Sequence, residues 1–160
     1  MTADEPAQRI ICALDTDDLD EAVGLAGRLK GRIGSVKLGL EFFTAHGPTG
    51  LARVADSGMP IFLDLKFSDI PNTVAGAIRA SAACAPAMLT IHVTGGPTMM
   101  RAAAAAGLRI ADATNGRRPK LLGVTVLTSF DEDDAAAVGM QGPLHDQVSR
   151  LAASNVTNDA

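Results

Sequence analysis

The sequence predicts an α/β fold of the TIM, or (β/α)8, barrel type that is incomplete, with about five of the eight units present. Apolar runs of strand length alternate five times with segments of helical spacing, as in a parallel sheet. The 160 residues fall short of the roughly 250 that a complete barrel needs. Asp15, Lys66, His92 and Thr128 stand at or near predicted strand ends, where TIM barrels carry their active sites. We therefore expect residues 1–160 to form one partial barrel domain.

Five apolar runs have the length and the flanking polar residues of buried strands. In chain order, the predicted strands cover residues 9–14, 35–40, 61–65, 88–93 and 121–127. No glycine-rich dinucleotide-binding loop follows the first of these strands. A barrel is therefore favoured over an open, doubly wound sheet, although five units could complete such a sheet.

Helical spacing or a helix-start signal follows each predicted strand. Asp17 and Asp18 are capping residues for the first helix, which extends to about Leu29. Pro71 and Pro97 precede or start the third and fourth helices, since proline has the φ of a first helical turn. The other predicted helices cover residues 48–57, 72–84, 98–106, 131–138 and 143–153.

Composition limits the class of protein. A hydrophobic content of 47% and a charged content of 20% describe a globular chain. The net charge of −4 argues against a general nucleic-acid surface. No apolar stretch approaches the roughly 20 residues of a membrane span, and the acidic N-terminus is unlike a secretory signal. Cys12 and Cys84 stand apart in apolar runs, as small buried hydrophobes rather than a disulfide or metal pair. We expect a cytoplasmic protein that binds neither nucleic acid nor a membrane.

The third predicted strand carries charges that a buried strand tolerates only if they pair or do chemistry. Asp64 and Lys66 share one strand face because side chains alternate, and Leu63 and Leu65 share the other. Asp69 follows in the predicted turn, so two carboxylates are expected to bracket one ammonium. Taken alone, an Asp-x-Lys pair is explained equally well as a structural ion pair at the end of a strand.

The segment from Asp64 to Thr73, DLKFSDIPNT, closely resembles the signature of the orotidine 5′-phosphate decarboxylase family. Four other segments resemble that family in the same order: Ala13-Leu14-Asp15, Lys37-Leu38-Gly39 followed by Glu41-Phe42-Phe43, His92-Val93-Thr94-Gly95-Gly96, and Val124-Thr125-Val126-Leu127-Thr128-Ser129. The similarity extends from about Ile10 to about Ala153. Because five ordered matches are hard to obtain by chance, the chain is identified as a member of this family.

The resemblance implies an enzyme of pyrimidine synthesis that converts orotidine 5′-phosphate (OMP) to uridine 5′-phosphate (UMP) and CO2. Loss of CO2 leaves a carbanion at carbon 6 of the ring, which a nearby ammonium can stabilise and protonate. By the resemblance, Lys66 is the proton donor. Asp64 would lie near the carboxylate of the substrate, where repulsion is relieved as CO2 departs.

The resemblance also implies roles for other residues. Lys37 would tie the carboxylates together and reach the ribose, and Asp15 would accept hydrogen bonds from ribose hydroxyls. Asp69 and Thr73 would reach across a two-fold interface into the neighbouring site, so a homodimer is expected. Thr128 would contact the pyrimidine. The expected catalytic residues are Lys37, Asp64, Lys66 and Asp69, and the expected substrate-binding residues are Asp15, Lys37, Asp64, Leu65, Lys66, Phe67, Ser68, Asp69, Ile70, Pro71, Asn72, Thr73 and Thr128.

Three signals have more than one reading. His92, at a strand end, makes a local hydrogen bond more often than it does catalysis. The pair Gly95-Gly96 before a helix suits either a phosphate or a flexible loop. Ser129 competes with Thr128 for the pyrimidine contact. The lysines would crowd a cation next to the carboxylates, so neither a metal nor another cofactor is expected.

Two other functions remain as alternatives. A hexulose-phosphate synthase resembles the Asp-x-Lys-x-x-Asp core but uses a metal, and segments 70–73 and 127–129 fit the decarboxylase instead. The second alternative is an inactive fragment or pseudoenzyme. The phosphate of the substrate is held by the seventh and eighth units in this family, and we expect the chain to lack them. Such a chain would be poorly soluble or oligomeric, and much less active than a complete barrel.

Overall fold

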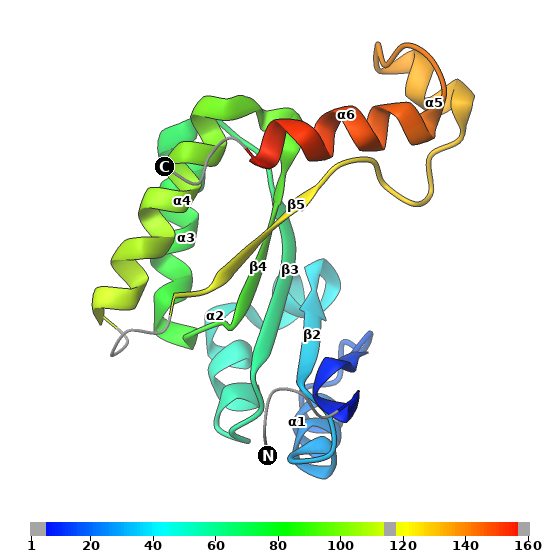
Figure 1. Cartoon of the computed structure of the whole chain (residues 1–160). Coiled ribbons are helices and arrows are strands. Elements are labelled where there is room, and N and C mark those ends of the chain that lie inside the picture. Colours follow the sequence, from blue (N-terminus) through cyan, green and yellow to red (C-terminus); the bar gives the residue numbers. More distant parts are fainter. Residues whose placement is uncertain (1–5, 114–117, 157–160) are drawn as a thin grey trace.

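The central sheet is parallel throughout and follows the order of the sequence. The computed structural model of the chain describes residues 6–113 and 118–156, in which five strands have the spatial order β1-β2-β3-β4-β5 (Figure 1). Neighbouring strands in sequential order form the wall of a barrel, whereas a doubly wound sheet reverses its order at a switch point. The strands are β1 (Ile11–Ala13), β2 (Ser35–Gly39), β3 (Ile61–Phe67), β4 (Met88–His92) and β5 (Lys120–Val124).

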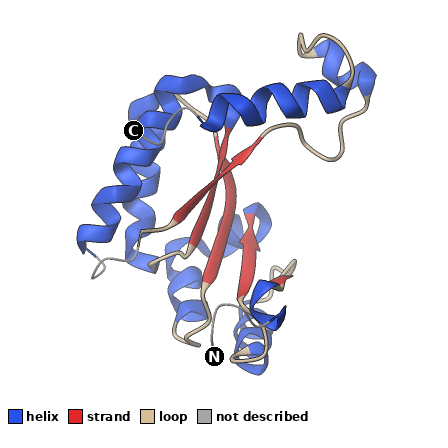
Figure 2. Cartoon of the chain, viewed as in Figure 1, coloured by secondary structure: helices blue, strands red, loops and turns tan. Residues whose placement is uncertain are grey.

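Helices connect the consecutive strands (Figure 2). As predicted, Asp18 caps the first helix by accepting a hydrogen bond from the N–H of Glu21 at 2.9 Å. No helix in the described part of the chain is both long and apolar enough to cross a membrane. The helices are α1 (Leu19–Leu29), α2 (Leu40–Ala55), α3 (Pro71–Ser81), α4 (Gly96–Ala113), α5 (Glu132–Ala137) and α6 (Leu144–Val156), with 3₁₀ turns η1 (Pro6–Arg9), η2 (Ala82–Cys84) and η3 (Val93–Gly95).

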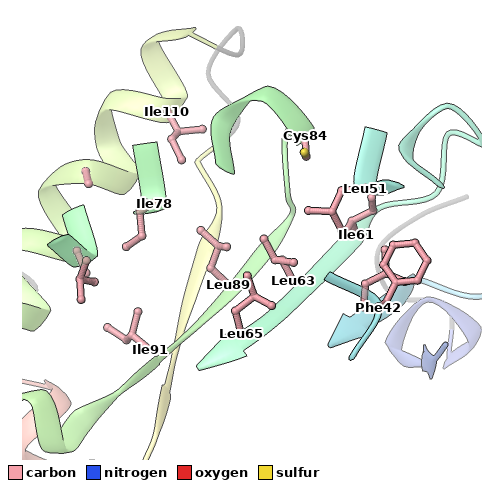
Figure 3. Packing of buried hydrophobic residues seen from close by; sticks show 14 of the residues in the cluster. Phe42, Leu51, Ile61, Leu63, Leu65, Ile78, Cys84, Leu89, Ile91 and Ile110 are labelled. Atoms are coloured by element: carbon pink, nitrogen blue, oxygen red, sulfur yellow. The ribbon is translucent and has the colours of Figure 1, made fainter. Parts of the chain in front are cut away.

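One face of the sheet is buried against the helices, among which α3 and α4 pack side by side (Figure 1). Leu63 and Leu65 of β3 are buried on this face, in the same core as Ile78 of α3 (Figure 3). Asp64 and Lys66, which alternate with these leucines, are only partly buried. Burial of each leucine contributes roughly 1.5–3 kcal/mol, so the alternation fixes which face of the sheet carries the charges.

Helix α2 begins earlier than predicted. The helix predicted from the sequence covers residues 48–57. In the structure α2 begins at Leu40, directly after β2, and kinks at Gly47, where φ is 56° and ψ is −158°. This backbone conformation is essentially restricted to glycine. The prediction therefore found only the second of two helical segments that join at Gly47.

The first and last strands are shorter than predicted, and the fourth helix is longer. β1 covers Ile11–Ala13 rather than 9–14, and β5 ends at Val124 rather than at 127. Each of these strands is paired on one side only within residues 6–113 and 118–156, so less backbone is held in a ladder. Helix α4 continues beyond the predicted end to Ala113, in a segment that contains the good helix formers Leu108, Arg109 and Ala111. The N-terminal residues 1–5, which were judged unlike a secretory signal, lie outside the described residues.

Candidate active site

Lys66 lies in an irregular segment near the carboxyl end of β3. The register between β3 and β4 shifts there, so that residues 64–66 face one residue of β4, Thr90. Lys66 has a φ of 49°, a left-handed value that is uncommon outside glycine. Its N–H donates a hydrogen bond to Oγ1 of Thr90 at 2.8 Å. Bulges of this kind re-aim side chains next to active sites, and here the ammonium of Lys66 meets Asp64.

Asp64 is the centre of the charged cluster. Its Oδ1 accepts hydrogen bonds from Nζ of Lys66 and Oγ1 of Thr90, both at 3.0 Å. Its Oδ2 lies 3.4 Å from Nζ of Lys37. Burial alone raises the pKa of Asp64, but the hydrogen bonds from Lys66 and Thr90 and the charges of both lysines outweigh burial. The net effect lowers the pKa from its ordinary value of 3.8, so Asp64 is a carboxylate at neutral pH.

Lys37 joins Asp64 to a second carboxylate. It lies within β2, next to β3, and its Nζ is 3.7 Å from Oδ1 of Asp15. The order Asp15–Lys37–Asp64–Lys66 alternates in sign, so each charge lies next to an opposite one. All four residues line one cavity of about 170 Å³, whose other walls are Leu14, Thr16, Gly39, Leu40, Glu41 and Phe42. A cavity of this kind at the carboxyl edge of parallel strands is typical of a small-molecule site.

The rest of the signature forms an exposed turn and the start of α3. Oδ1 of Asp69 accepts a hydrogen bond from the N–H of Ile70 at 2.6 Å. Among the described residues Asp69 makes no ion pair with Lys66, so the expectation that two carboxylates bracket Lys66 within one chain is not met. Ile70 is 66% exposed and Thr73 is also exposed, on the surface around this turn. The remaining predicted residues of the segment are Leu65 (buried), Phe67 and Pro71 (partly buried), and Ser68 and Asn72 (exposed).

Thr128 does not lie at a strand end as predicted, whereas His92 lies at the end of its strand as predicted. Because β5 ends at Val124, Thr128 occupies an exposed turn beyond the strand, and it does not line the cavity of the charged cluster. His92 is the last residue of β4 and is partly buried. Burial, and then the charge of Lys66, lower the pKa of His92 from its ordinary value of 6.5. The imidazole is therefore neutral at neutral pH.

Sequence reasoning missed Thr90. This residue is 4% exposed and contacts both residues of β3 that were predicted as catalytic, Lys66 and Asp64. A signal was present, because Thr90 is the hydroxyl in the otherwise apolar run before His92. Residues two positions apart share a strand face, so Thr90 was placed on the face that His92 occupies.

The donor set of the cluster suits anions and proton transfer. Each carboxylate faces a lysine, so little unneutralised negative charge is left for a cation. In the part of the chain that the structure describes, no group of three or more His, Cys, Asp or Glu side chains is arranged to hold a metal ion. A lysine next to a carboxylate can instead donate a proton to a substrate atom.

Comparison with known proteins identifies relatives of the chain. A family model described as "Orotidine 5'-phosphate decarboxylase / HUMPS family" matches residues 8–159. The chain belongs to this family. It is 49% identical to the orotidine 5′-phosphate decarboxylase of Rhodospirillum rubrum over 94% of this chain and 61% of that protein. Identity to the orotidine 5′-phosphate decarboxylase of Ehrlichia chaffeensis is 51%, over 89% of this chain and 58% of that protein.

The chain spans about 60% of the length of the curated OMP decarboxylases that it matches. Among solved structures it resembles the orotidine 5′-phosphate decarboxylase of Lactobacillus acidophilus, with a TM-score of 0.85 and 32% identity. That likeness covers 94% of this chain and 68% of the other. The family resemblance inferred from five sequence segments is confirmed, and so is the partial TIM barrel.

Proposed function

We propose that this chain carries the catalytic cluster of an OMP decarboxylase, which converts OMP to UMP and CO2. The observation that carries the proposal is the alternating cluster in which Asp64 lies 3.0 Å from Lys66 and 3.4 Å from Lys37. The names of relatives about half identical in sequence support it. Because the chain spans about 60% of their length, the activity itself is part of the proposal.

In the proposed reaction, the bond between carbon 6 and the carboxylate of OMP breaks, and the electron pair stays on carbon 6 as CO2 leaves. The ammonium of Lys66 stabilises this developing charge and transfers a proton to carbon 6, which gives UMP. The neutral lysine then regains a proton from solvent. Asp64 holds the ammonium in place, and its repulsion of the substrate carboxylate disappears as CO2 departs.

The same proposal assigns substrate binding to the rest of the cavity and signature. Asp15 and Lys37 would bind the ribose, and Thr128 would approach the pyrimidine from its turn. Asp69 and Thr73 are exposed, which supports a role in the active site of a second copy of the chain. We therefore propose a two-fold homodimer in which each copy contributes residues to the site of the other. We further propose that the enzyme is cytoplasmic and needs no cofactor.

The test is an assay of OMP decarboxylation by the purified chain after exhaustive chelation. The proposal predicts UMP and CO2 in equal amounts, at a rate that neither chelation nor added magnesium changes. A strict requirement for magnesium would favour the metal-dependent synthase considered above. Binding of UMP in a thermal-shift measurement without any product would favour the pseudoenzyme, and either outcome contradicts the proposal.

A further inference from the structure

We infer that Thr90 is a positioning residue of the active site, whose hydroxyl fixes the irregular segment of β3 that presents Lys66 to Asp64. The kinetic part of this inference rests on the proposed decarboxylase function. The geometric part rests on two contacts of one hydroxyl, with the backbone of Lys66 and with the carboxylate of Asp64.

The direction of both hydrogen bonds follows from the chemistry of the groups. The N–H of Lys66 can only donate, so Oγ1 of Thr90 accepts that bond, at 2.8 Å. An ionised carboxylate can only accept, so the single hydroxyl hydrogen of Thr90 is donated to Oδ1 of Asp64, at 3.0 Å. The same Oδ1 accepts the bond from Nζ of Lys66. The hydroxyl, the carboxylate and both nitrogens of Lys66 therefore form one closed ring of contacts.

The backbone at Lys66 needs such a partner. Residues 64–66 oppose Thr90 alone, so the regular pairing between β3 and β4 is interrupted there. Lys66 also holds a φ of 49°, which costs free energy in a residue with a Cβ. The hydroxyl of Thr90 supplies the bond that a β4 carbonyl supplies in a regular ladder. It thereby compensates for the conformation that aims the lysine.

Burial makes this hydroxyl hard to replace by water. Thr90 is 4% exposed, and its backbone is held in register with Leu122 of β5. A β-branched side chain on a fixed strand has few accessible rotamers, so Oγ1 stays near one position. A chain without the hydroxyl would keep Lys66 and Asp64 but lose the constraint that brings them together.

The experiment compares Thr90→Val, which keeps the shape but removes the hydroxyl, with Thr90→Ser, which keeps the hydroxyl. Thr90→Val is expected to lower kcat for OMP at least about tenfold with KM within about threefold, whereas Thr90→Ser stays within about threefold of the parent. The acid limb of the pH–rate profile should move to higher pH in Thr90→Val only, because Asp64 loses a hydrogen bond to its charged form.

Ser81→Ala is the matched control for loss of a buried hydroxyl. Ser81 is 9% exposed, and its Oγ donates to the carbonyl of Ile78 within α3, outside the charged cluster. It should lower the melting temperature without moving kcat or the acid limb. If Thr90→Val behaves like Ser81→Ala, Thr90 is a structural residue only and the inference is wrong.

A second measurement separates this inference from the proposed function. NMR spectra of the chain report the amide of Lys66 and the carboxyl carbon of Asp64 without any turnover. In Thr90→Val the Lys66 amide should exchange faster with solvent, and the Asp64 carboxyl should titrate at higher pH than in the parent. Unchanged values would overturn the inference even if the parent is active. The predicted NMR changes with an inactive parent would uphold the geometric role and overturn the proposed function.

Discussion

Nζ of Lys66 and Oδ1 of Asp64 are 3.0 Å apart, and the two residues are two positions apart on the same strand. Side chains at such positions in a regular strand stand next to each other on one face. Here, however, β3 is not regular, because the backbone of Lys66 is left-handed and the register of β3 with β4 shifts at residues 64–66. The position of the proposed proton donor therefore depends on Asp64 as well as on its own backbone.

Asp64→Asn should separate the charge of this residue from its shape. The asparagine keeps the volume but leaves Lys37 and Lys66 without their shared carboxylate, so we expect kcat to fall by at least about 100-fold. Because Lys37 and Lys66 are 26% and 33% exposed, the free energy of unfolding should fall by only about 1–2 kcal/mol. Steady-state kinetics and urea unfolding measure the two effects. A kcat within about threefold of the parent would contradict the role of Asp64.

The free energy of unfolding should decrease as the pH falls. The pKa of His92 is below its ordinary 6.5 in the folded chain, so the unfolded chain binds the proton first and stability declines as pH drops below 6.5. The pKa of Asp64 is also lowered, so its contribution is present above 3.8 and is lost as pH falls through the lower folded value. Urea unfolding at several pH values between about 8 and 5 tests the contribution of His92.

His92→Gln should remove the part of the slope that lies just below pH 6.5, since glutamine does not titrate. His145→Gln is the matched control, because this exposed histidine lies on α6 and pairs with the exposed Asp146. An unchanged slope in His92→Gln, or an equal loss of slope in the two variants, would contradict this account.

Shared sites in a homodimer can be tested by mixing two inactive variants. Asp69→Ala removes the residue proposed to reach the neighbouring site, and Lys66→Ala removes the proposed proton donor. A heterodimer of these variants would contain one site with both residues intact. In an equal mixture about half of the dimers are heterodimers, so activity should recover to about one quarter of that of the parent. No recovery at concentrations where native mass spectrometry detects heterodimers would contradict the shared site.

Much of the fold follows from the order of apolar runs in the sequence. Five strands and the helices between them were predicted in the observed order. The predicted alternation in β3, with Leu63 and Leu65 buried and Asp64 and Lys66 on the other face, was confirmed. The kink at Gly47 was not predicted, because a glycine before a proline is read as a helix boundary. In the structure it joins two helical segments.

The charged cluster was predicted only in part. Period-two alternation places Asp64 and Lys66 on one face, and parallel pairing brings Lys37 next to them. A shift of register depends on contacts between strands, so neither the bulge at 64–66 nor the role of Thr90 could be derived from one strand's sequence. Thr128 was expected at a strand end and lies in a turn, because β5 ends at Val124.

The 160-residue chain by itself is expected to associate with other copies. β1 and β5 each have one unpaired edge among the described residues, and unpaired edges template further pairing. Ile11→Lys places a charge on the edge strand β1, where Ile11 is 43% exposed, and should reduce the apparent mass in light scattering. Leu108→Lys, at a 51% exposed position of α4, is the control and should leave the apparent mass unchanged. A monodisperse monomer of the parent chain would contradict the expectation.

The most direct measurement of the central claim is OMP decarboxylation by the Lys66→Ala variant, compared with the parent chain and with Lys120→Ala. Lys120 is an exposed lysine at the start of β5 and lies outside the charged cavity, so its removal controls for loss of positive charge. We predict that Lys66→Ala lowers kcat by at least about 1,000-fold while still binding UMP, and that Lys120→Ala stays within about threefold of the parent. Decarboxylation by Lys66→Ala within about tenfold of the parent would contradict the assignment of Lys66 as the proton donor.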